Sequence, residues 1–248
     1  MNFSNILFLD IETVPQQPAY DALDERWRGL WDIKAGTLLR GREGETPGSI
    51  YERAGIYAEF GKIICICVGC IQDPAPKASA DGAGEGSARK LLLKSYAGDD
   101  EAELLRAFAA SLQQHWARPD RFLCAHNGKE FDYPYLCRRF IINGIPIPEP
   151  LLIAGRKPWE VRHLDTMELW KFGDFKSYTS LNLLAAALGV PSPKDDIDGS
   201  MVGDVYWKEK DLARIVRYCF KDVVTLANVL LRYHCEEIIP EEWVEIRG

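Results

Sequence analysis

A short apolar run followed at once by two acids, Asp10 and Glu12, constrains this chain more than any other feature of its sequence. Residues 6–9 contain no polar side chain, which is typical of a central strand covered on both faces of a sheet. Side chains alternate along a strand, so Asp10 and Glu12 project to the same side as Phe8. Two acids on one face of a buried strand lose water and repel each other unless a cation is bound. Oxygen ligands of this kind suit Mg²⁺ or Mn²⁺. The alternative is that the strand ends here and its acids reach solvent.

Hydrophobic periodicity divides the rest of the chain into strands and helices. The expected strands are 6–9, 62–71, 90–96, 121–125 and 161–165, and the expected helices are 20–34, 101–116, 131–143, 180–188 and 209–233. This order predicts an α/β fold with a central mixed five-stranded sheet flanked by helices. We expect one domain over residues 1–248, with a flexible surface loop in the Pro-, Ala- and Gly-rich segment 72–89.

The composition is that of an ordinary globular protein, with 47% hydrophobic and 27% charged residues. We find no apolar run long enough to span a bilayer and no secretory leader, so we expect a cytoplasmic protein with no membrane partner. Seven cysteines, an odd number, argue against a full disulfide framework. Cys65, Cys67 and Cys70 lie in an apolar strand without zinc-finger partners, so we interpret them as small buried side chains.

A third acid, Asp222, lies in a helix whose apolar residues recur at helical spacing: Ile215, Cys219, Val223, Leu226 and Leu230. Asp222 falls on or beside this apolar face, where an unpaired charge is costly. Tyr218, four residues earlier, shares that edge of the helix. A structural ion pair with Arg217 or Lys221 would explain Asp222 equally well.

A fourth acid, Asp132, ends the segment 127–132 (NGKEFD), which directly follows the expected strand 121–125. In open α/β sheets, ligands gather at the carboxyl ends of the strands. Asp132 would be delivered to that edge on the next turn or helix. Taken alone, it could simply cap the helix.

These segments resemble the three exonuclease motifs of the DEDD superfamily, which has a ribonuclease-H-like fold. The matching segments are 8–13 (FLDIET), 125–132 (AHNGKEFD) and 218–222 (YCFKD). The third has the tyrosine form, YxxxD, because the position at which the other form places histidine is Arg217. The chain resembles in particular a stand-alone version of the proofreading exonuclease domain of family B DNA polymerases. Segments 61–66 and 163–167 also look like that group, and the resemblance spans residue 6 to about residue 233.

The resemblance implies a metal-dependent 3′–5′ exonuclease that releases nucleoside 5′-monophosphates by two-metal-ion hydrolysis. It implies that two Mg²⁺ or Mn²⁺ ions bind four carboxylates: Asp10, Glu12, Asp132 and Asp222. Tyr218 would then orient the attacking water, since a phenol with an ordinary pKa near 10 is a poor base unaided.

The expected partner is a nucleic-acid 3′ end. DNA is favoured over RNA, and single-stranded DNA is the expected substrate. Thr13, Asn127 and Phe131 are candidates to contact the terminal nucleotide, although Phe131 suits the core slightly better. A net charge of −7 argues mildly against a tight, non-specific binder of duplex DNA. Two alternatives stay open: an exoribonuclease with the same carboxylates, and a catalytically silent nucleic-acid-binding module.

Overall fold

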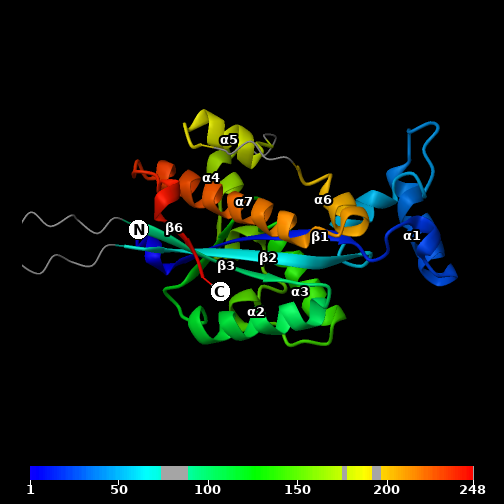
Figure 1. Ribbon diagram of the computed structural model, residues 1–248, viewed down its shortest axis with the longest axis horizontal. Coiled ribbons are helices and arrows are strands. Elements are labelled where there is room, and N and C mark those ends of the chain that lie inside the picture. Colours follow the sequence, from blue (N-terminus) through cyan, green and yellow to red (C-terminus); the bar gives the residue numbers. More distant parts are fainter. Residues whose placement is uncertain (74–88, 175–177, 192–196, 248) are drawn as a thin grey trace, which may run out of the picture.

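The computed structural model describes residues 1–73, 89–174, 178–191 and 197–247, and its centre is a mixed sheet covered by helices on both faces (Figure 1). The sheet is 6-stranded, in the order β5-β4-β1-β2-β3-β6. The strands are β1 Ile6–Pro15, β2 Gly61–Gln72, β3 Lys90–Ala97, β4 Phe122–Ala125, β5 Leu164–Asp165 and β6 Val244–Ile246. β2 is antiparallel to β1 and β3, whereas β4, β5 and β6 join through parallel pairs. The expected mixed-sheet α/β fold is confirmed, with β6 as one strand more than predicted.

The helices form a layer on each side of the sheet (Figure 1). One face carries α4 Thr166–Lys171, α5 Leu181–Ala187 and α7 Leu212–Tyr233, and the other carries α2 Glu101–His115 and α3 Asp132–Ile142. α1 Glu25–Leu38 projects beyond one end of the sheet, and α6 Val202–Asp204 leads towards α7 (Figure 1). Short 3-10 turns lie at Phe3–Asn5, Tyr20–Ala22, Tyr51–Ile56, Glu149–Leu151, Pro158–Glu160 and Glu241–Trp243. No helix of the described residues is long and apolar enough to cross a membrane.

β1 is longer than the expected strand and therefore carries both acids inside the sheet. β2 pairs with β1 from Leu7 to Pro15, with a register shift between Glu12 and Thr13. Asp10 lies opposite Cys67, and Glu12 lies opposite Cys65 on the neighbouring strand. The apolar run stops at residue 9, but the backbone pairing does not, because a strand's hydrogen bonds do not depend on its side chains. The strand boundary expected at residue 9 is therefore wrong, and so is the alternative that the strand ends at the acids.

α7 begins at Leu212, three residues later than predicted, because a π-helical turn precedes it at Val205–Glu209. Lys210 has a φ of 59°, which interrupts the helical path, and Asp211 then caps α7 by accepting a 2.9 Å hydrogen bond from the amide of Arg214. The apolar face predicted for this helix is buried against the sheet, beside residues of β1 such as Phe8. This packing sets the rotation of α7 above β1.

Several other boundaries differ from the expectation. The helix predicted at 20–34 forms as a 3-10 turn followed by α1, and the strand predicted at 161–165 is only the 2-residue β5. Trp31 on α1 is fully buried, and its indole donates a 2.8 Å hydrogen bond to the carbonyl of Pro47. The excursion between β1 and β2 thus has a small core of its own. Most of the loop expected at 72–89, namely 74–88, lies outside the described residues.

A buried ion pair joins the layer of α2 and α3 to the start of β2. The Glu101 carboxylate accepts hydrogen bonds from the amide of Ile63 at 2.7 Å and from Arg139 Nε at 2.8 Å. Arg139 makes a second contact to the same carboxylate through Nη2, and its Nη1 donates to the carbonyl of Ala58 at 2.7 Å. The two side chains are only 6% and 8% exposed. Every contact of this pair bridges segments that are distant in sequence.

Candidate active site

The structure brings the four predicted acids together around residues 10–12 of β1. Asp10 and Glu12 come from β1, Asp222 from α7, and Asp132 is the first residue of α3. Burial raises the pKa of Asp10 well above its ordinary value, and the nearby carboxylates of Asp222 and Asp132 raise it further. Burial also raises the pKa of Glu12, and repulsion from Asp10 and Asp222 raises it further. The four acids therefore form one electrostatic unit.

Asp132 is the most enclosed of these acids, with 4% of its surface exposed. Burial raises the pKa of Asp132 to about 7, and hydrogen bonds from its own amide and that of Ile11 only partly oppose this. The amide of Ile11 belongs to β1, so this contact fixes the start of α3 against the strand that carries Asp10 and Glu12. A carboxylate from a distant motif is held next to the pair on β1.

Tyr218 lies one helical turn before Asp222 on the same edge of α7, as the sequence predicted. Burial raises the pKa of its phenol, and so do the charges of Asp222, Glu12 and Asp10 and a hydrogen bond to Asp222. The phenol therefore stays protonated at physiological pH and is a hydrogen-bond donor rather than a base.

The chemistry of these donors fits a hard divalent cation. Like charges on partly or fully buried carboxylates destabilise one another, and the pKa values of Asp10 and Glu12, raised first by burial and then by the neighbouring acids, show this cost. A bound cation would convert this repulsion into attraction, and carboxylate oxygens are the ligands that Mg²⁺ and Mn²⁺ prefer. The residues that could hold such ions are the four acids: Asp10, Glu12, Asp132 and Asp222.

Comparison with known proteins assigns the family. A family model described as "Predicted 3'-5' exonuclease related to the exonuclease domain of PolB" matches residues 59–241. The chain belongs to this family. The matched residues include Asp132, Tyr218 and Asp222, whereas Asp10 and Glu12 precede them. The resemblance to DEDD-type 3′–5′ exonucleases inferred from the sequence is thereby confirmed.

One of two similar solved structures shows a shared fold. The family B DNA polymerase from the hyperthermophilic archaeon Pyrobaculum calidifontis is 14% identical with a TM-score of 0.52, over 93% of this chain and 24% of that chain. The exonuclease thus spans about a quarter of that polymerase, and the likeness shows the fold alone. The RNase domain of the yeast Pop2 protein is 13% identical with a TM-score of 0.38, over 98% of this chain and 81% of that chain. No curated protein matches the chain.

Asp165 holds the loop of the exonuclease that leads to Asp132. Its carboxylate accepts hydrogen bonds from the amides of Asn127 and Lys129, both at 3.0 Å. It also caps α4 by accepting from the amides of Met167 and Glu168. The loop was predicted to deliver Asp132, but the role of Asp165 in anchoring it was not. An aspartate followed three residues later by glutamate resembles a capping signature, which indicates the cap but not the loop contact.

Gly128 fixes the shape of the same loop. A Cβ atom at this position would lie 2.4 Å from the Cβ of Ala125, so no larger residue fits without moving the backbone. Asn127 just before it has a φ of 63°, a left-handed conformation that asparagine tolerates better than most residues. The sharp turn after β4 is thus specified by the pair Asn127 and Gly128.

The three predicted substrate-contact residues lie in two different kinds of surroundings. Asn127 and Thr13 are half-buried; Thr13 directly follows Glu12, and Asn127 begins the loop that leads to Asp132. Phe131 is half-buried and packs its ring 5.3 Å from that of Tyr135, against the core on the α2 and α3 side of the sheet. These contacts favour the core role that the sequence analysis preferred for Phe131. They leave Asn127 and Thr13 as the better candidates for a terminal nucleotide.

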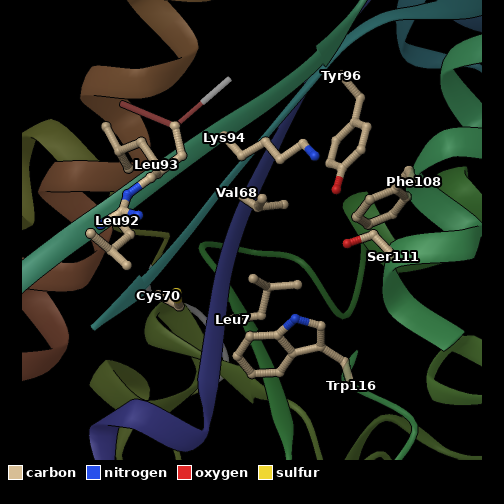
Figure 2. A pocket seen from close by; sticks show the side chains of 11 residues that line it. Leu7, Val68, Cys70, Leu92, Leu93, Lys94, Tyr96, Phe108, Ser111 and Trp116 are labelled. Carbon is tan, nitrogen blue, oxygen red and sulfur yellow. The ribbon is translucent and has the colours of Figure 1, made fainter. Parts of the chain in front are cut away.

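A cavity of about 200 Å³ lies on the other face of the sheet, between the sheet and α2 (Figure 2). Leu7, Val68, Phe108 and Trp116 converge on it from β1, β2, α2 and the end of α2. Leu7 and Asp10 have opposite parity on β1, so this cavity and the side chain of Asp10 lie on opposite faces of the strand. None of the four acids lines it. The apolar hollow is therefore separate from the candidate active site.

The raised pKa values predict how a divalent ion changes stability with pH. A carboxyl whose pKa is raised on folding contributes stability below its unfolded pKa, about 4, and that contribution is lost as pH rises through the folded pKa. For Asp132 the folded pKa is about 7. We therefore expect the metal-free protein to lose Tm between pH 5 and pH 8, and saturating Mg²⁺ to raise Tm more at pH 8 than at pH 6. Thermal unfolding with and without Mg²⁺ measures both.

The variant Asp132→Asn should flatten the pH dependence of Tm in the metal-free protein. An equal Mg²⁺-induced rise in Tm at pH 6 and pH 8 would contradict the electrostatic account.

Proposed function

We propose that this exonuclease removes nucleoside 5′-monophosphates from the 3′ end of DNA, with single strands preferred, by two-metal-ion hydrolysis. The observation that supports this most is the convergence of four carboxylates and Tyr218, from three separate motifs, on one place in the fold. Two Mg²⁺ or Mn²⁺ ions held by those carboxylates would activate water and stabilise the leaving oxygen of an in-line displacement.

Each acid has a distinct proposed role. Asp10 is repelled by both Asp222 and Asp132, which supports a position between them and a carboxylate shared by both ions. Glu12 is repelled more by Asp222 than by Asp132, so we assign Glu12 and Asp222 to the ion that activates water. Asp132 would hold the second ion. Asn127 and Thr13 would contact the terminal nucleotide.

The phenol of Tyr218 would orient the attacking water through its hydroxyl. Replacing Tyr218 by phenylalanine is expected to lower kcat by roughly 10²-fold, the lower end of what a positioned acid–base group contributes. The Mg²⁺-induced rise in Tm should persist, because all four carboxylates remain. Single-turnover cleavage and thermal unfolding of the same variant separate the two effects. An unchanged kcat would remove Tyr218 from the site.

DNA is proposed as the substrate because the family is described as related to the exonuclease domain of PolB and the fold is shared with a DNA polymerase. An exoribonuclease with the same acids is the alternative, and it would need contacts to the terminal 2′-OH. The test is competition between single-stranded DNA and RNA of one sequence, each labelled at its 5′ end, in the same Mg²⁺ reaction. Faster shortening of DNA supports the proposal, and faster shortening of RNA replaces it with the alternative.

A catalytically silent binding module is less well supported, because every acid and the tyrosine of the three motifs is present.

We also infer a cytoplasmic location. All seven cysteines lie in the described part of the chain and all are free, which is consistent with a reducing compartment.

A further inference from the structure

Three thiols from two distant elements meet next to the acids. Cys65 and Cys67 come from β2 and Cys219 from α7, and their sulfur atoms all lie within 4.8 Å of one another. The Cys65 and Cys67 sulfurs are 3.6 Å apart, and all three side chains are fully buried. We call Cys65, Cys67 and Cys219 the thiol cluster. Three cysteines with converging sulfurs are a ligand set for a soft cation, whereas isolated buried cysteines are only small apolar side chains.

The thiol cluster is continuous with the carboxylates. The thiol of Cys219 lies 3.3 Å from Asp10 Oδ2 and 3.5 Å from the backbone oxygen of Asp10. Asp10, Glu12 and Cys219 also offer ligand atoms within 4.8 Å of one another. Asp10 is half-buried and lies between the enclosed sulfurs and the other acids. One carboxylate oxygen is thus available to both groups.

Two of the six distances between these ligand atoms are close to those of a tetrahedral zinc site. Zinc–sulfur bonds of about 2.3 Å and zinc–oxygen bonds of about 2.0 Å place two sulfurs roughly 3.8 Å apart, and a sulfur and an oxygen roughly 3.5 Å apart, around a tetrahedral ion. The Cys65–Cys67 distance of 3.6 Å and the Cys219–Asp10 distance of 3.3 Å are close to these edges. A bound ion would draw Asp10 Oδ2, which now groups with Cys219 and Glu12, towards Cys65 and Cys67.

We propose that the thiol cluster, with Asp10 Oδ2 as fourth ligand, binds a thiophilic divalent cation of the zinc class and that this binding inhibits the enzyme. Each thiol releases its proton to solvent as the thiolate binds the ion. Thiolates select zinc over Mg²⁺, whereas the neighbouring carboxylates favour Mg²⁺ or Mn²⁺. A zinc-class ion therefore withdraws Asp10 from catalysis without competing for the other acids. The inhibition rests on the proposed exonuclease activity, but the binding does not.

Binding is tested by spectroscopy, with Co²⁺ as the probe. One equivalent of Co²⁺ should give the wild-type protein a thiolate-to-cobalt charge-transfer absorption, which one equivalent of Zn²⁺ abolishes. Cys67→Ala should weaken Co²⁺ binding at least tenfold. Cys124→Ala is the matched control, because Cys124 is equally buried but lies on β4 outside the cluster. The site would be overturned if Cys67→Ala kept the absorption at the wild-type Co²⁺ concentration, or if Cys124→Ala lost it to the same extent as Cys67→Ala.

X-ray absorption of the wild-type protein with one equivalent of Zn²⁺ needs no variant. Sulfur neighbours at about 2.3 Å are expected, and a shell of oxygen and nitrogen alone would overturn the site.

Inhibition is tested separately, by titrating Zn²⁺ into cleavage reactions that contain saturating Mg²⁺. Relative to each protein's own zinc-free rate, Cys67→Ala should need at least tenfold more Zn²⁺ for half inhibition than wild type and Cys124→Ala. Equal inhibition of all three would place the inhibitory zinc elsewhere and overturn that part. A thiolate signal without cleavage of any nucleic acid would keep the metal site and reject the proposed function. Cleavage without a thiolate signal would keep the proposed function and reject the metal site.

Discussion

Asp10→Asn is expected to lower the rate of nucleic-acid cleavage by more than the roughly 10–100-fold that loss of an outer-shell partner costs a metal site. Asparagine keeps the size of the side chain and removes the charge that a shared metal ligand needs. The same substitution should raise the Tm of the metal-free protein, because Asp10 is repelled by both Asp222 and Asp132. Cleavage assays and thermal unfolding in EDTA measure the two effects. Loss of function with a gain of stability is the signature of a strained catalytic site.

The control is Asp21→Asn, which removes a carboxylate from an exposed position outside the site. Its cleavage rate and its Tm in EDTA should equal those of the wild-type protein. If Asp10→Asn cleaves at the wild-type rate, Asp10 is not a metal ligand. If it loses activity and also loses stability in EDTA, the repulsion inferred among the acids is wrong.

Arg139→Met is expected to lower the free energy of unfolding by about 3–5 kcal/mol, the cost of leaving one partner of a buried ion pair uncompensated. Arg139 and Glu101 are almost fully enclosed, and the substitution removes the hydrogen bonds and the charge that Arg139 supplies to the carboxylate of Glu101, together with its hydrogen bond to the carbonyl of Ala58. Methionine keeps an apolar side chain of similar length. Urea unfolding measures the change as a lower midpoint with an unchanged slope.

The matched control is Arg42→Met, because Arg42 pairs with Glu45 in an exposed ion pair whose side chains are 47% and 41% accessible. That pair is worth about 0–1 kcal/mol. Equal losses in the two variants would mean that burial of the Arg139 pair does not determine its contribution.

Local patterns in the sequence singled out the acids of the candidate site, and the resemblance to the three exonuclease motifs joined them, with Tyr218, into one predicted site. Asp10 and Glu12 stand out because they follow an apolar run, and Asp222 stands out because it adjoins an apolar helical face. Both are conflicts between a charged residue and a buried position, and such conflicts are visible without a structure. The loop before Asp132 was recognisable because its Asn-Gly pair marks a turn after a strand.

The features that were missed depend on contacts between distant segments. β6 has only 3 residues and exists because it pairs with β3, from the opposite part of the chain. Asp165 reads as a helix cap, yet its bonds to the loop at Asn127 require β5 to lie beside β4. Cys65 and Cys67 were interpreted as packing residues, because no residue near them in the sequence indicates that Cys219 lies beside them in the fold. Only the rotation of α7 over β2 brings the third sulfur to them.

The central claim is tested most directly by the polarity and products of cleavage. Single-stranded DNA labelled at its 5′ end is incubated with the protein in Mg²⁺, in Mn²⁺ or in EDTA, and the released material is identified. We predict a ladder that shortens from the 3′ end with either ion, release of nucleoside 5′-monophosphates, and intact DNA in EDTA. Intact substrate in every condition, immediate loss of the labelled 5′ nucleotide, or cleavage that persists in EDTA would contradict a metal-dependent 3′–5′ exonuclease.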